Sequence, residues 1–248
     1  MDQSVAILGH VALAFLLAVA GSAVSVLVGI SHQRLCALIS LAAGTLLGVT
    51  IFTILPEAAQ SMSWWKLSLA LVSGYFVFFF VSRYVYHVCP ACAASHFDEA
   101  TTHRFSEIAS ALIIALGLHS TLDGLALAAG HEAHRGASMV LAICVHKVPE
   151  GLALGALLLG AGYRKVQVIA WVAAVEATTV LGGLAGILWL QPGFWLDVVL
   201  AHAGGGFVFL AAHAVLGEMV KHGKTIVLTN FAVGVVLIGV LNLAVRTW

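Results

Sequence analysis

The stretch HKVPEG, residues 146–151, lies inside one of the most apolar parts of the chain. It follows GASMVLAICV and precedes LALGALLLGAG, yet four of its six residues are polar or disturb helices. A matching stretch, HSTLDG at 119–124, lies upstream and is also followed by Leu-Ala-Leu. Both contain a histidine, three further residues, a carboxylate and a glycine. We call them the first cassette (119–124) and the second cassette (146–151), and the duplication guides the interpretation of the whole sequence.

The composition around the cassettes predicts a membrane protein. Of 248 residues, 61% are hydrophobic and 9% are charged, whereas a soluble domain carries about 25% charged residues. A helix that crosses a bilayer needs about 20 apolar residues. We therefore expect an all-α polytopic membrane protein that forms a single transmembrane domain over 1–248, with eight transmembrane helices. The expected spans are 5–30, 35–55, 64–86, 107–130, 137–161, 166–190, 195–219 and 225–246.

The basic residues predict the orientation, since cytoplasmic loops are enriched in Lys and Arg. With the N-terminus outside, seven basic residues fall in inside loops and three fall outside, so both termini are expected outside a plasma or inner membrane. The first span lacks a basic flank and a nearby cleavage site, so we interpret it as retained. The zero net charge without a basic stripe argues against nucleic acid as a partner.

The longest expected loop, HVCPACAASHFDEATTHR at 87–104, is dense in metal-ligand side chains. It falls on the cytoplasmic side, where thiols stay reduced, so a disulfide is not expected. Thiolates and imidazoles together suit soft metals, although a polar linker with incidental cysteines would have the same composition. The candidate ligands are His87, Cys89, Cys92, His96 and His103.

Each cassette places two metal-ligand residues on one helix face. His119 and Asp123 are four residues apart, as are His146 and Glu150, so each pair is separated by about 6 Å along its helix axis. Two crossing helices would bring together two imidazoles and two carboxylates, a mixture that Zn²⁺ accepts in tetrahedral geometry. The expected spans run in opposite directions, which gives the fold the inverted-repeat character common among transporters.

Further charged residues are expected inside the membrane, where each unpaired charge costs at least about 2.5–3.5 kcal/mol. Lys147 can pair with Glu176, and that pair can simply hold helices together. Pro149 removes one backbone hydrogen bond from its helix. Gly124 and Gly151 follow the carboxylates and allow close approach of neighbouring helices.

At these residues the sequence resembles the ZIP (Zrt/Irt-like, zinc–iron permease) family of metal transporters. The matching stretches are GTLLGVTIFTILPEA at 44–58, HSTLDGLALA at 119–128, HKVPEGLALG at 146–155, AVEATTVLGG at 174–183 and GGGFVFLAAHAVLGE at 204–218. The last departs from the Pro-Glu ending common in the family. The resemblance implies an eight-helix ZIP-like fold and a metal site between the fourth and fifth spans, at His119, Asp123, His146 and Glu150.

The resemblance also implies residues along the metal pathway. Ser120, Lys147 and Glu176 match the family's second metal position, and a charged lysine there implies a single bound metal. By the same analogy, Glu57 lies at the outer entrance, and His213 and Glu218 line the inner exit.

The favoured function is transport of divalent metal ions into the cytoplasm. Zn²⁺ is the expected substrate, Fe²⁺, Mn²⁺ and Cd²⁺ are compatible with the same site, and no catalytic cofactor is expected. The family includes homodimers, but no span demands one. An intramembrane zinc hydrolase is the alternative, although HKVPE is not the HExxH of metalloproteases. A metal sensor without transport also remains open.

Overall fold

The computed structural model describes residues 3–28, 32–81, 83, 113, 116–129, 136–189, 194–219 and 224–246. Helices dominate these residues and no strand occurs among them, which confirms the all-α class for this part of the chain. The elements are α1 (Gln3–Val28), α2 (His32–Val49), the π-helical turn η1 (Thr50–Ile54), α3 (Leu55–Ser61), α4 (Trp64–Phe80), α7 (Gly136–Gly160), α8 (Lys165–Trp189), α9 (Phe194–Met219) and α10 (Lys224–Arg246). Residues 116–129 form a further helical segment.

Among the residues that the structure describes, five helices are long and apolar enough to cross a membrane. They are Ser4–Leu27, Ser40–Ser61, Met139–Ala156, Lys165–Trp189 and Thr225–Ala244, and shorter apolar helices occur at Trp64–Phe80 and Asp197–Ala212. Each overlaps a span expected from the sequence. Large apolar side chains such as Leu27 and Leu188 are exposed on the outside of the bundle, as lipid contact requires. The protein is therefore an integral membrane protein.

The second expected span is longer than its apolar stretch indicated. It continues past residue 55 through η1 and α3 to Ser61. Pro56 does not end the helix, because it lies in the first turn of α3, where its missing N–H is tolerated. The preceding π turn, in which the Leu55 N–H donates to the Thr50 carbonyl, widens the backbone just before the ring.

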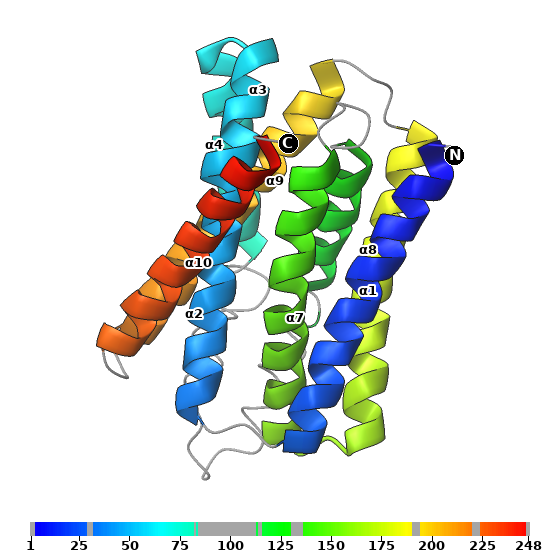
Figure 1. Cartoon of the computed structure of the whole chain (residues 1–248), viewed down its shortest axis with the longest axis vertical. Coiled ribbons are helices and arrows are strands. Elements are labelled where there is room, and N and C mark those ends of the chain that lie inside the picture. Colours follow the sequence, from blue (N-terminus) through cyan, green and yellow to red (C-terminus); the bar gives the residue numbers. More distant parts are fainter. Residues whose placement is uncertain are drawn as a thin grey trace.

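The helices pack in two groups that meet along α2 and α7. In the first group α1 packs on α7 and α8, and the Thr178 hydroxyl on α8 donates to the Gly117 carbonyl of segment 116–129. In the second group α2 packs on α9 and α10, and α4 packs on α9. Figure 1 shows α1 and α8 side by side at one flank, with α2, α4 and α10 at the other. The start of α1, the end of α10 and α3 all lie at the same end of the bundle.

The glycines that close the two cassettes lie at backbone contacts, as the sequence predicted. A Cβ on Gly124 would overlap the carbonyl oxygen of Thr179 on α8, and one on Gly151 would overlap that of Ala18 on α1. The two glycines do not face each other. Each holds its cassette against a different neighbouring helix of the first group. These contacts fix the position of both cassettes along the axis of the bundle.

Replacing Gly151 by alanine should therefore lower the free energy of unfolding by about 1–3 kcal/mol, the usual cost of overpacking. Gly9→Ala is the matched control, because Gly9 lies on α1 with nothing within 4 Å of its added Cβ. Unfolding in mixed detergent micelles would measure both. Equal stability of the two variants would contradict the close packing of α7 on α1.

Candidate metal centre

Four metal-ligand side chains from the two cassettes meet in the core of the bundle. His119 and Asp123 come from segment 116–129, and His146 and Glu150 come from α7. One ligand atom from each residue lies within 4.8 Å of the others, and none of the four residues is more than 7% exposed. We call this set the four-ligand cluster. α7 remains helical through Pro149, so both of its ligands stay on one face.

The cassettes face each other in opposite directions. The Nε2 atom of His119 lies 3.8 Å from Glu150 Oε2, at the far end of the second cassette. Asp123 Oδ2 lies 3.3 Å from His146 Nε2, at its near end. The first residue of each cassette thus meets the carboxylate of the other, which is an antiparallel pairing. Asp123 Oδ2 is also 3.5 Å from His119 Nε2, so it lies between both imidazoles.

The side chain of Lys147 enters the centre of this arrangement. Its Nζ lies 2.9 Å from Glu176 Oε2, which confirms the predicted pair. It also lies 2.8 Å from Asp123 Oδ2 and 3.0 Å from Glu150 Oε2, and it donates to Ser120 Oγ at 2.9 Å. Sequence reasoning missed the contacts with the cluster's own carboxylates. The spacing Lys147–Glu150, three residues apart on one helix, was the available signal.

Glu176 reaches the site from α8 and is completely buried. Its Oε2 accepts hydrogen bonds from Thr179 Oγ1 at 3.4 Å and from Ser120 Oγ at 3.5 Å. Ser120 Oγ is also within hydrogen-bonding distance of Glu150 Oε1, at 3.4 Å. Thr179 was not predicted, although it lies one helical turn after Glu176. These hydroxyls hold the Glu176 carboxylate beside the four-ligand cluster.

An aromatic ring from the second group of helices closes one side of the cluster. Phe207 on α9 is completely buried, and its ring centroid lies 5.1 Å from that of His119 and 6.4 Å from that of His146. This contact could not be predicted from the sequence, since Phe207 is one apolar residue in an apolar span. An apolar wall lowers the local dielectric and strengthens any charge interaction inside the site.

The donor set fits a borderline divalent metal ion. Asp123 Oδ1 and His119 Nδ1 are buried and accept or donate no hydrogen bond among the described residues, so each retains unused polar capacity. Ligand atoms around a tetrahedral zinc ion lie about 3.4 Å apart, given bonds of about 2.0–2.2 Å. Distances of up to 4.8 Å therefore need only a small contraction. The two imidazoles favour Zn²⁺ over Mg²⁺ or Ca²⁺.

The remaining predicted residues lie away from the cluster or outside the described part. Glu57 is buried in the first turn of α3 and does not join the cluster. His213 and Glu218 belong to α9, but their side chains are outside the described residues. The whole loop 87–104, with its cysteines and histidines, also lies outside them.

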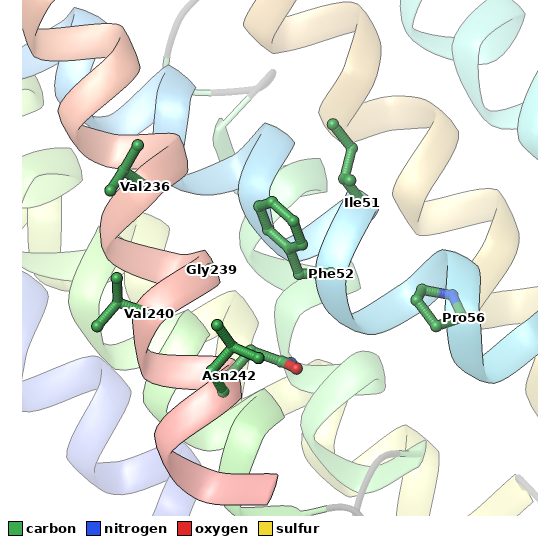
Figure 2. A pocket seen from close by; sticks show the side chains of 8 residues that line it. Ile51, Phe52, Pro56, Val236, Gly239, Val240 and Asn242 are labelled. Atoms are coloured by element: carbon green, nitrogen blue, oxygen red, sulfur yellow. The ribbon is translucent and has the colours of Figure 1, made fainter.

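A separate groove of about 390 Å³ lies between η1, α3 and α10. Figure 2 shows side chains that line this groove, among them Phe52 and Val236, and most of them are apolar. Its polar member is Asn242, whose amide donates to Thr53 Oγ1 at 3.0 Å. The groove contains no residue of the four-ligand cluster, so it is not the metal centre.

Comparisons with known proteins identify the family of the chain. A family model described as ZIP Zinc transporter matches residues 87–246, which include both cassettes and Glu176. An uncharacterized protein of Methanocaldococcus jannaschii is 25% identical to this chain over 201 residues, which make up 81% of each chain.

Replacing His146 by alanine should weaken Zn²⁺ binding by at least about tenfold, because it removes one of the four candidate ligands. Isothermal titration of the purified protein in detergent measures the change. His202→Ala is a suitable control, since His202 on α9 lies 2.9 Å from Ser73 Oγ on α4 and does not belong to the cluster. Equal loss of affinity in both variants would argue against the four-ligand cluster as the binding site.

Proposed function

We propose that this chain, which belongs to the ZIP zinc transporter family, carries Zn²⁺ across the membrane into the cytoplasm through the four-ligand cluster. Membership of the family makes it a membrane transporter of metal ions. The identity of the ion, its direction and its site are the proposal. The observation that carries it is the convergence of two imidazoles and two carboxylates, buried and within 4.8 Å, from the two cassettes.

The ligand count favours transport over hydrolysis. A catalytic zinc ion keeps three protein ligands and an open position for water. Here four protein side chains converge, and they would fill a tetrahedral site. Such a site shields an ion that has lost its water shell during passage, which is the requirement of a carrier.

Charge balance also supports a divalent cargo. Asp123, Glu150 and Glu176 surround the ammonium of Lys147, and metal ligation requires uncharged imidazoles. Three ionised carboxylates and one ammonium leave two negative charges in a buried site. One divalent cation neutralises this charge, so the loaded site can cross a medium of low dielectric constant at less cost.

The two groups of helices suggest how access alternates. The four ligands, Lys147 and Glu176 all belong to the first group, whereas Phe207 and Glu57 belong to the second. Movement of the first group along the second would carry an intact site past a fixed wall. In this mechanism Glu57 guards the outer entrance, while His213 and Glu218 line the inner exit.

Flux measurements test the proposed transport directly. Proteoliposomes with wild-type protein of known orientation should take up Zn²⁺ with saturation, and the double variant His146→Ala/Glu150→Ala should lose this uptake because half of the ligands are gone. His202→Ala again serves as the control. Zinc that binds to wild-type protein without any flux would instead support the sensor or hydrolase interpretation.

The proposed topology has eight spans with both termini outside. The described helical segments, counting α2, η1 and α3 as one, number eight, and the start of α1 and the end of α10 lie at one end of the bundle. The turn at 161–164, where Gly162 has a φ of 83°, links α7 to α8 and belongs to the cytoplasmic side in this topology.

Epitope tags at the N-terminus, at the C-terminus and after Gly162 test this arrangement in intact cells. Both terminal tags should be accessible to antibody from outside, and the tag after Gly162 only after permeabilisation. Terminal tags on opposite sides would rule out an even number of spans.

A further inference from the structure

The ammonium group of Lys147 lies against the oxygens that would bind the metal. Its Nζ is 2.8 Å from Asp123 Oδ2, the same atom that faces His146 at 3.3 Å and His119 at 3.5 Å. It is 3.0 Å from Glu150 Oε2, which also faces His119. A positive charge of this chain therefore already lies where the carboxylates of the four-ligand cluster would hold a cation.

Lys147 has more partners than it has hydrogens to share. An ammonium carries three N–H donors, yet four oxygens lie within 3.0 Å of Nζ. Two of them belong to the four-ligand cluster. The other two, Ser120 Oγ and Glu176 Oε2, lie outside it and 3.5 Å from each other. The ammonium can thus release the cluster and keep two partners, without leaving its buried position.

We propose that Lys147 is a tethered cation, which occupies the carboxylates of Asp123 and Glu150 between cargo ions and withdraws to Ser120 and Glu176 when a divalent metal ion binds. This role rests on the proposed transport function. It goes beyond the expectation that the lysine merely fills a second metal position, because it places the ammonium in competition with the cargo at the first position.

The tethered cation has two opposite effects on transport. It weakens metal binding, because the metal must displace the ammonium and then remain near it. It also lowers the charge of the empty site from three negative units to two, which lowers the cost of returning that site through a low-dielectric path. The ammonium therefore lowers the affinity of the site for the metal ion and at the same time speeds the return of the empty carrier.

Equilibrium binding of Zn²⁺ in detergent tests the first effect. Lys147→Met removes the charge and keeps most of the length, and it should lower the Kd for Zn²⁺ by at least about tenfold, since a like charge within a few ångströms disappears. Lys165→Met is the matched control, because Lys165 is the exposed first residue of α8. Weaker binding by Lys147→Met, together with lower thermal stability, would show a structural lysine and overturn the proposal.

Glu176→Gln supplies a test of opposite sign that does not depend on the folding of Lys147→Met. It removes the anchor to which the ammonium withdraws, so the ammonium should stay on the cluster and the Kd should rise. Unchanged or tighter binding by Glu176→Gln would contradict the proposal. In the double variant the Kd should match that of Lys147→Met alone. A further loss of affinity there would identify Glu176 as a direct ligand and contradict its role as the anchor.

Vesicle transport separates this role from the proposed function. Net Zn²⁺ uptake into metal-free vesicles requires the empty site to return, whereas exchange with Zn²⁺ inside preloaded vesicles does not. Lys147→Met should therefore reduce net uptake by a larger factor than exchange. If the variant reduces net uptake and exchange by the same factor while the wild-type protein is active, the tethered-cation role is wrong and the proposed transport function still holds. Absence of Zn²⁺ uptake by the wild-type protein would contradict the proposed transport function itself.

Discussion

A positive charge held among three buried carboxylates is the constraint on which the centre of this protein depends. In a membrane such charges are tolerated only where they meet partners. Lys147 meets Asp123, Glu150 and Glu176, which come from three different helices. Removing the ammonium would leave three buried carboxylates without a counter-charge, a costly defect. The same interaction therefore joins segment 116–129, α7 and α8, and it keeps an excess of negative charge that suits a divalent cation.

Close contacts between helix backbones hold these charged groups in place. Lipid gives helices no hydrophobic reason to associate, so they associate through small residues. Gly124 lies on the backbone of α8 and Gly151 on that of α1, each one residue after a cassette carboxylate. In the second group Gly44 and Gly205 make equivalent contacts with α10 and α4. Because the backbones cannot separate or slide locally, the carboxylates are held at fixed heights inside each group.

The sequence predicted those features that follow from spacing along one helix. His119 with Asp123 and His146 with Glu150 each share a face because they are four residues apart, and the apolar stretches indicated most of the helices. It did not predict contacts that depend on how helices rotate against each other. The reach of Lys147 to Asp123 and the ring of Phe207 beside His119 are of this kind. The second span was expected to end at residue 55 because the apolar stretch stops there, but the more polar residues that follow continue as helix α3 to Ser61.

The candidate ligands and the aromatic ring that covers them lie in different groups of helices, which bears on the proposed movement between the groups. The four-ligand cluster, Lys147 and Glu176 all lie in the first group of helices. Phe207, which covers the imidazoles, lies in the second. A site whose ligands were shared between the groups would break whenever the groups moved, and each break would expose a buried charge. In the proposed mechanism all four candidate ligands stay on one side of the boundary between the groups, and the ring of Phe207 lies against their imidazoles from the other side. The proposed movement would then change what covers the metal ion without changing what binds it.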